Sequence, residues 1–186
     1  MFFLVLFLLK YLLMWILLAA IFAFLLYVVW KYWTLIIGAG YDPAPMKVVR
    51  KMLKMAEIGE NDIVYDLGCG DGRIVLTAAR EFGTRAVGIE ADPLRFLIAY
   101  FKTLFSNQRD KVTIKLGNFM KMPIGDATCV TLFLFSRANN ILIPKFEREL
   151  TPGTRIVSYV WKIKGWKPVK MDAIEEIYVY IVPKPD

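Results

Sequence analysis

One stretch decides the fold of this 186-residue chain, Asp62-Ile63-Val64-Tyr65-Asp66-Leu67-Gly68-Cys69-Gly70-Asp71-Gly72. Its first half is largely apolar, as in a buried strand, and its second half is rich in glycine. Residues 74–82 then show the apolar spacing of a helix. A strand, a glycine-rich turn and a helix N-terminus in this order form the ligand crevice of open α/β sheets. The sequence therefore predicts an α/β domain with a ligand at this turn.

The glycines follow the spacing G-x-G-x-G, which differs from the G-x-G-x-x-G of dinucleotide sites. Asp66 stands two residues before the first glycine, where its carboxylate would repel a pyrophosphate. A cationic ligand reverses this preference, because a carboxylate and loop carbonyls suit the α-amino group of S-adenosyl-L-methionine. We therefore expect this molecule as the cofactor. Its expected contacts in the loop are Asp66, Gly68, Cys69, Gly70 and Gly72.

The ends of the next two strands supply further cofactor contacts. Glu90 ends a strand at residues 86–90 and is placed to accept hydrogen bonds from both ribose hydroxyls. A third strand, 112–116, precedes Asn118, expected to bond the adenine amine, and Phe119, expected to cover the ring. An ordinary turn is the alternative for these last two residues. The contacts expected beyond the loop are Glu90, Ala91, Asn118 and Phe119.

The remaining pattern completes the sheet. An apolar run suits a central strand, a helix and a fifth strand come next, and two short segments are typical of a terminal hairpin. These elements are expected at residues 127–135, 142–150, 155–161, 168–171 and 174–182, in that order. We therefore expect a Rossmann-like, seven-stranded sheet that is parallel until the hairpin.

The first 40 residues carry only two charged side chains, Lys10 and Lys31. Residues 11–30 contain none, and at about 1.5 Å rise per residue they match a hydrocarbon core of roughly 30 Å. A cleavable signal peptide is the alternative, but it needs a basic start and a small-residue cleavage site that this sequence lacks. We expect a single transmembrane helix at about residues 11–30, within a membrane anchor at residues 1–36.

A linker at residues 37–45, with two glycines and two prolines, follows the anchor and precedes a domain at residues 46–186. Basic residues after the anchor outnumber Lys10 before it, so the positive-inside rule places the domain in the cytoplasm. The chain contains two cysteines and no histidine. We therefore expect a reducing compartment and no metal.

Residues 46–58 predict an amphipathic helix with a basic stripe. The stripe consists of Lys47, Arg50, Lys51 and Lys54. It could rest on anionic headgroups, or it could be a solvated face. The net charge of +7 would also suit a nucleic-acid binder. No RNA-binding motif or basic patch interleaved with aromatic residues is present, so we expect the membrane bilayer, and not nucleic acid, as a partner.

Five stretches of the domain are similar to one known family. They are Tyr41-Asp42-Pro43-Ala44-Pro45, Ile63-Val64-Tyr65-Asp66-Leu67-Gly68-Cys69-Gly70-Asp71-Gly72-Arg73-Ile74, Ala86-Val87-Gly88-Ile89-Glu90, Gly117-Asn118-Phe119 and Leu150-Thr151-Pro152-Gly153-Thr154-Arg155-Ile156-Val157-Ser158. Together they resemble the small archaeal protein-lysine methyltransferases of the seven-β-strand class and their membrane-anchored mitochondrial relatives. The resemblance covers nearly the whole domain.

This resemblance implies a methyltransferase that transfers the methyl group of S-adenosylmethionine to lysine side chains of membrane or membrane-proximal proteins. A methyltransferase of a lipid or hydrophobic small molecule is the alternative. A non-catalytic, cofactor-binding membrane module is a more distant one. The chain departs from the family pattern at Asp42 and at Tyr159-Val160-Trp161.

The acceptor side of the site has no histidine to take a proton from a lysine ammonium. Carbonyl, hydroxyl or carboxylate groups are left for that role, and the candidates are Tyr41, Asp42, Ser136, Asn139 and Tyr159. Ser136 and Asn139 follow the fourth strand, where the crevice opens, so we expect them, with Tyr41, to position the substrate. A helix-capping role is the alternative for each serine or asparagine.

Overall fold

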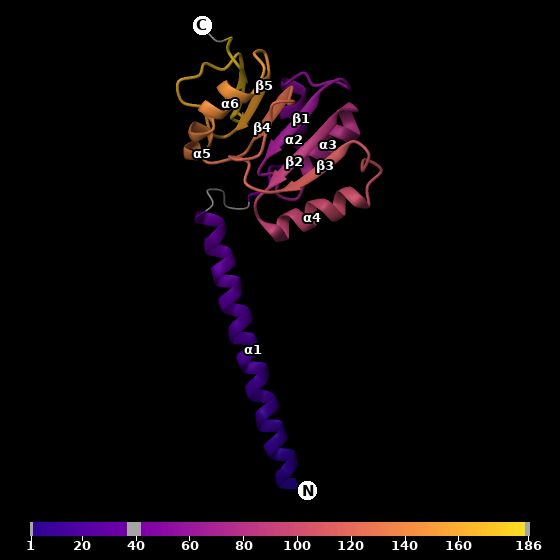
Figure 1. The fold of residues 1–186 in the computed structure, drawn as a ribbon, viewed down its shortest axis with the longest axis vertical. Helices are drawn as coiled ribbons and strands as arrows, with labels where there is room; N and C mark the ends of the chain where they lie inside the picture. Colours follow the sequence, from indigo (N-terminus) through magenta and orange to yellow (C-terminus); the bar gives the residue numbers. More distant parts are fainter. Residues whose placement is uncertain (1, 37–41, 185–186) are drawn as a thin grey trace. The chain divides into compact units, whose positions relative to one another are not determined.

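The structure is a computed structural model of the whole chain, and it describes the backbone of residues 2–36 and 42–184 and the side chains of residues 7–29 and 42–184. Figure 1 traces its elements in chain order. The chain divides into two compact units, Met1–Gly40 and Tyr41–Asp186.

The first unit is one helix, α1 (Phe2–Ile36). Its stretch Phe7–Val29 has a mean hydropathy of 2.8 and none of its side chains is buried within the protein. A helix that is apolar on all sides needs an apolar environment, and 23 residues rise about 34 Å, enough to cross a bilayer. The stretch covers the span expected at residues 11–30 as far as Val29 and begins before Lys10.

The second unit is built on a seven-stranded sheet in the order β3-β2-β1-β4-β5-β7-β6. The strands are β1 (Ile63–Leu67), β2 (Arg85–Glu90), β3 (Val112–Leu116), β4 (Cys129–Leu132), β5 (Arg155–Tyr159), β6 (Lys170–Asp172) and β7 (Ile177–Ile181). The first five strands run parallel, and β7 and β6 form an antiparallel hairpin at the β5 side. The prediction of a Rossmann-like sheet, parallel until a terminal hairpin, is confirmed.

Five helices accompany the sheet (Figure 1). They are α2 (Met46–Met55), α3 (Arg73–Phe82), α4 (Pro93–Leu104), α5 (Ser136–Ile141) and α6 (Ile143–Glu149). Helix α3 packs on β1 and β2, α2 packs on α3 and β5, and α4 packs on β2 and β3. Apolar faces of α2 and α3 fill the core, where Val49, Met52 and Leu53 have no exposed surface.

The last four strands are shorter than predicted, and the hairpin strands expected at residues 168–171 and 174–182 are Lys170–Asp172 and Ile177–Ile181. The fourth was expected at residues 127–135 but ends at Leu132, which pairs with Leu67. Because β1 also ends there and turns into the glycine loop, the residues after Leu132 have no pairing partner on the β1 side. The fifth strand was expected to reach Trp161 but ends at Tyr159, since Val160 has a φ of 66° and leaves the extended conformation.

The basic stripe of α2 is largely neutralised within the domain. Lys47 forms an ion pair with Glu175 at 2.7 Å, and Arg50 forms one with Glu81 at 2.9 Å. Lys51 pairs with a carboxylate of β6. Three of the four cations are thus engaged with side chains of their own domain, which favours the interpretation of the stripe as a solvated face over contact with lipid headgroups.

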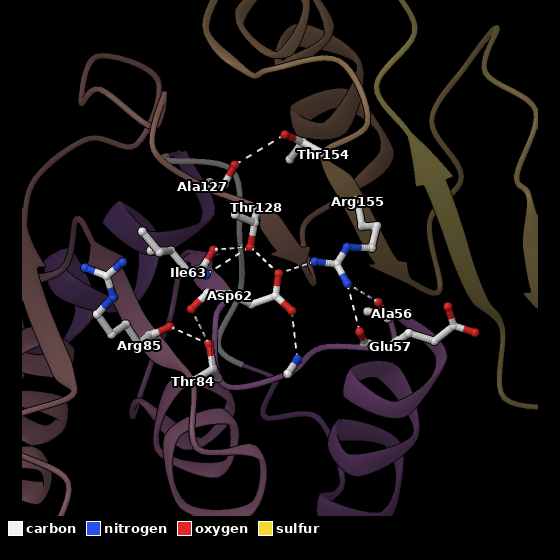
Figure 2. A network of polar contacts seen from close by, with 11 residues as sticks. Ala56, Glu57, Asp62, Ile63, Thr84, Arg85, Ala127, Thr128, Thr154 and Arg155 are labelled. Atoms are coloured by element: carbon white, nitrogen blue, oxygen red, sulfur yellow. Dashed lines mark hydrogen bonds and ion pairs between the residues drawn. The ribbon is translucent and has the colours of Figure 1, made fainter.

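A polar network fixes the amino ends of the central strands, at the edge away from the glycine loop (Figure 2). Asp62 accepts hydrogen bonds from Thr128 Oγ1 at 2.6 Å and from the Gly59 amide at 2.7 Å. Arg155 pairs with the same carboxylate and donates to the Ala56 carbonyl at 2.9 Å. Burial alone would raise the pKa of Asp62, but these hydrogen bonds and the guanidinium charge outweigh it and lower that pKa. The network therefore ties α2, β1, β4 and β5 together.

Candidate active site

The glycine loop joins β1 to α3 at the carboxyl edge of the sheet, as predicted. The amides of Gly68 and Cys69 both donate to the Ile89 carbonyl, at 2.8 and 3.1 Å, which clamps the loop onto β2. Gly68 has a φ of 80°, and a Cβ built there would lie 3.0 Å from a methyl group of Leu134. Gly72 has a φ of 78°. Both positions require glycine, and they leave the backbone of the loop bare toward a ligand.

Asp66 lies at the centre of the site and is only 2% exposed. Thr131 of the neighbouring strand donates to its Oδ1 at 2.8 Å, and the sheet register places these two residues side by side. Burial raises the pKa of the Asp66 carboxyl to about 7, and repulsion from Glu90 and Asp71 adds to this effect. A buried carboxyl with so high a pKa favours a ligand that brings a positive charge.

Glu90, 5% exposed, connects two turns of the crevice. Its Oε2 accepts from the Gly70 amide at 2.7 Å, and its Oε1 accepts from the Asp92 amide at 3.0 Å. Asp92 in turn caps α4 by accepting from the Leu94 amide at 2.8 Å. Ala91 lies between these two carboxylates. Each Glu90 oxygen keeps lone-pair capacity for a hydroxyl group, so these bonds position the carboxylate without saturating it.

Asp71, which the sequence analysis did not single out, locks the loop in place. It forms ion pairs with Arg73 at 2.8 Å and with Lys102 of α4 at 2.7 Å. Burial opposes ionisation of Asp71, but the two cations hold its pKa at about 2. Arg73 also donates to the Ala44 carbonyl at 3.0 Å. One carboxylate therefore links the loop to α4 and, through Arg73, to the start of the domain.

The turn after β3 has features of both an adenine contact and an ordinary turn, the two interpretations of its sequence. Asn118 is exposed, and its side-chain oxygen accepts from the Met120 amide at 2.9 Å, as in an ordinary turn. Phe119 is 7% exposed, and one of its ring carbons lies 3.9 Å from the position of a Cβ on Gly68. The structure thus brings Phe119 to the loop, and the oxygen of Asn118, which accepts one hydrogen bond within its own turn, keeps a lone pair for a second donor.

Cys69 and Cys129 are both free and buried. Burial raises the pKa of each thiol. A Cβ on Gly88 of β2 would lie 2.7 Å from Cys69 Sγ, so the Cys69 side chain fills space against the sheet. Within the described part of the chain, no group of three or more His, Cys, Asp or Glu residues could hold a metal ion.

Asn139 of α5, which was expected on the acceptor side, is buried and contacts the end of β5. Its Nδ2 donates to Ser158 Oγ and to the Trp161 carbonyl, both at 3.0 Å. Among the described residues, its Oδ1 has no hydrogen-bond partner. Ser136 begins α5 one turn before Asn139. Tyr41, the third residue expected here, lies outside the described residues.

The backbone at the end of β5 is strained. Val160 has a φ of 66°, and the Trp161 amide donates to the Tyr159 carbonyl at 2.8 Å, the bond of a three-residue γ-turn. A β-branched residue in this region costs about 1–3 kcal/mol. The turn directs the Trp161 carbonyl to Asn139 and sets the Trp161 ring against Phe135, with ring centroids 6.2 Å apart. Both rings are partly exposed, at 38% and 45%.

The signals for these additional residues were weak in the sequence. Thr131 is a polar residue within an apolar strand, but its partner Asp66 becomes apparent only from the register of β1 and β4. Arg73 follows the last glycine of the loop directly, yet its contact with Ala44 joins residues 29 positions apart.

Comparisons with known proteins agree with this geometry. The family described as ANTKMT methyltransferase domain matches residues 66–170. A protein-lysine N-methyltransferase of Saccharolobus islandicus is 43% identical over 149 residues, which cover 76% of this chain and 92% of the relative. The adenine nucleotide translocase lysine N-methyltransferase of Mus musculus is 27% identical, over 83% of this chain and 72% of its own length.

A solved structure is also similar. It is titled an RNA methyltransferase from Salinibacter ruber in complex with S-adenosyl-L-homocysteine, and it superposes with a TM-score of 0.76 and 37% identity. The match covers 78% of this chain and 96% of that one. The predicted cofactor and the predicted family are thus confirmed. This chain belongs to the ANTKMT methyltransferase family and is an S-adenosylmethionine-dependent methyltransferase.

Proposed function

We propose that this methyltransferase methylates lysine side chains of membrane or membrane-proximal proteins. The observation that carries the proposal is the 43% identity to a protein-lysine N-methyltransferase over 92% of that relative's length. The helix α1, which is apolar and long enough to cross a bilayer, supports a substrate at the membrane. A second relative is named for lysine methylation of the adenine nucleotide translocase, a membrane-associated protein.

For the cofactor, we assign the α-amino group to Asp66 and the backbone of the glycine loop. The buried carboxyl supports this assignment, because an ammonium beside it would stabilise its ionised form. We assign the ribose hydroxyls to Glu90, which ends β2 and accepts from the Gly70 amide of the loop, and the adenine ring to Phe119. Bound S-adenosylmethionine supplies an electrophilic methyl group, and the residues of the crevice hold it in line with the acceptor.

For the acceptor, we assign a positioning role to Asn139 and Ser136. Asn139 holds the strained turn, and the turn places the rings of Phe135 and Trp161 at the surface. The aliphatic stem of a lysine can pack on such rings, with its amine directed to the crevice. Tyr41 remains a prediction for the same edge.

A pair of asparagines tests this role. Asn139→Ala should lower kcat/KM for the acceptor by about tenfold or more and leave the Kd of S-adenosylmethionine unchanged. Asn140, whose side chain accepts from the Lys164 amide at 2.9 Å, provides the matched control, and Asn140→Ala should alter neither quantity. Equal effects of the two substitutions would remove Asn139 from the acceptor side.

For the location, we propose a single-pass protein anchored by residues 1–36, with the catalytic domain on the cytoplasmic side. The excess of basic residues after the span supports this orientation. We also propose residues 37–45 as linker and 46–186 as catalytic domain, although Ala44 is already buried against the domain, at 3% exposure. Protease digestion of sealed vesicles with the cytoplasmic face outward should remove the domain and leave the span protected.

The chemical class of acceptor is tested with native membranes. The full chain is incubated with methyl-labelled S-adenosylmethionine and membranes, and the products are divided into protein, lipid extract and RNA. We expect the label in protein, recovered as methyl-lysine after hydrolysis. Label in the lipid extract would support a lipid acceptor instead, and nuclease-sensitive label would support the RNA activity named for the similar Salinibacter ruber structure. Either result would refute the lysine proposal.

A further inference from the structure

Helix α4 is apolar on its outer side as well as its inner side. Inward it packs on the sheet and buries Ala99 and Thr103. Outward it exposes large side chains, and Phe105, just beyond its end, is 83% exposed. The exposed residues are Leu94, Leu97, Ile98, Tyr100, Phe101, Leu104 and Phe105. A helix that is apolar all round is normally covered on every side, so the outer face of α4 requires an occupant.

The exposed side chains form a continuous stripe. Leu97 and Ile98 stand three and four residues after Leu94, and Phe101 and Phe105 continue the same spacing, so the five residues share one face of the helix. They line a depression in the surface together with Lys102. The rings of Phe101 and Phe105 stack with centroids 6.3 Å apart, which extends the stripe beyond the end of the helix.

The charges around this stripe fit a lipid surface. Helix α4 contains no acidic residue, and its two cations, Arg95 and Lys102, both lie to one side of the stripe. Lys102 remains 50% exposed beside its ion pair with Asp71. Aliphatic and aromatic residues on one face with basic residues beside them characterise helices that lie in the membrane interface, where anionic headgroups attract the cations.

The described start of the domain lies close to α4. Residues 37–41 separate α1 from the described start of the domain, and five residues reach at most about 20 Å. Within the domain, the Ala44 carbonyl accepts a hydrogen bond from Arg73, which directly follows Gly72. A Cβ on Gly72 would lie 3.2 Å from Cβ of Ala99 on α4. The chain therefore enters the domain beside the helix that carries the exposed stripe.

We propose that α4 is an interfacial helix whose outer stripe inserts into the headgroup and acyl boundary of the membrane that holds α1. The inference goes beyond the proposed function, because it assigns a second, monotopic contact to the catalytic domain. Glu90 lies three residues before α4, so this contact holds the carboxyl edge of the sheet close to the headgroups. Lysines at the membrane surface then lie within reach of the crevice.

Nitroxide labels on the full-length protein test the contact by depth. The protein is reconstituted into vesicles of phosphatidylcholine with phosphatidylglycerol, and single cysteines carry the label at Ile98→Cys on the stripe, Ile174→Cys in the β6–β7 turn and Leu18→Cys in α1. Ile174 is an isoleucine 92% exposed, which makes it the matched control. The native cysteines are buried and resist labelling. Unchanged S-adenosylmethionine affinity verifies that each labelled protein is folded.

We expect the labels at positions 98 and 18 to collide more with oxygen, which partitions into lipid, than with a water-soluble nickel complex, and the label at 174 to show the reverse. A water-exposed label at 98 with a lipid-exposed label at 18 would overturn the proposal while leaving the anchor intact. Shielding of the label at 98 from both reagents would mean a protein occupant, such as a second copy, and would also overturn it. A water-exposed label at 18 would refute anchor and contact together. The experiment measures the depth of each label in the membrane and not methyl transfer, so a negative result can be distinguished from failure of the lysine assignment.

Discussion

Replacement of Asp66 by asparagine tests the central assignment of the site. Asparagine keeps the shape of the side chain and the hydrogen bond from Thr131 but removes the charge. A charge-assisted hydrogen bond to the cofactor ammonium contributes about 2–3 kcal/mol, so the Kd should rise roughly 30- to 150-fold once Asp66 is ionised. Isothermal titration calorimetry of the full chain in detergent measures this difference.

The effect should depend on pH in a specific direction. The pKa of Asp66 is raised to about 7, so the wild-type carboxyl is mostly neutral below that value and mostly ionised above it. Wild-type affinity should fall by up to about tenfold per pH unit as the pH drops below 7, whereas the asparagine variant should stay nearly constant. The two proteins should therefore still differ by about 3- to 15-fold near pH 6, converge near pH 5 and diverge most near pH 8.

The same substitution should stabilise the protein in the absence of cofactor. Because the folded-state pKa of Asp66 lies above its unfolded value, ionisation of this carboxyl destabilises the fold progressively as pH rises from about 4 to 7. Asparagine removes that penalty, which amounts to at most about 4 kcal/mol at pH 8. Equal affinity of both proteins at pH 8, or a variant less stable than the wild type there, would refute the reasoning.

Three further substitutions test other parts of the domain. Asp62→Asn should lower the free energy of unfolding by about 3 kcal/mol near neutral pH, because Arg155 loses its carboxylate partner. Since the pKa of Asp62 is lowered, the difference should begin to shrink as the pH falls below about 4 and disappear as it falls through the lowered pKa, and a constant difference in acid denaturation would contradict this. Gly68→Ala should weaken cofactor binding at least about tenfold by calorimetry, because this residue needs a φ of 80°. Gly59→Ala is the control and should leave binding unchanged, because the space around its Cβ is open. Equal binding by both variants would count against a role of the loop in cofactor binding. Val160→Gly should relieve the strained turn and raise the free energy of unfolding by about 1 kcal/mol, measured as a higher midpoint of urea unfolding. A lower midpoint would show that the turn is unstrained.

The loop and the parallel sheet with its terminal hairpin could be predicted because both depend on local patterns. A strand, glycines at fixed spacing and a helix lie within about twenty residues, and the rules for parallel sheets then place Glu90 beside the loop. The position of Thr131 could not be predicted, since it depends on the register between strands 65 residues apart. The positive φ of Val160 could not be predicted from the sequence, because valine strongly favours the extended backbone of the preceding strand.

Two of the family motifs have different structural roles. The Thr-Pro-Gly-Thr-Arg stretch lies at the amino edge of the sheet, where Arg155 completes the network around Asp62. It supports the fold from the side opposite the crevice. The Asp-Pro-Ala-Pro stretch, by contrast, reaches the crevice itself, because the Ala44 carbonyl is a partner of Arg73.

This contact between Ala44 and Arg73 has a mechanical consequence. Arg73 holds Asp71 of the glycine loop with one part of its guanidinium and the first turn of the domain with another. A displacement of the Ala44 backbone would therefore move Arg73 and, through it, the carboxylate that fixes the cofactor loop. Changes at the first described residues of the domain should thus alter how tightly the cofactor is held before they alter the stability of the domain.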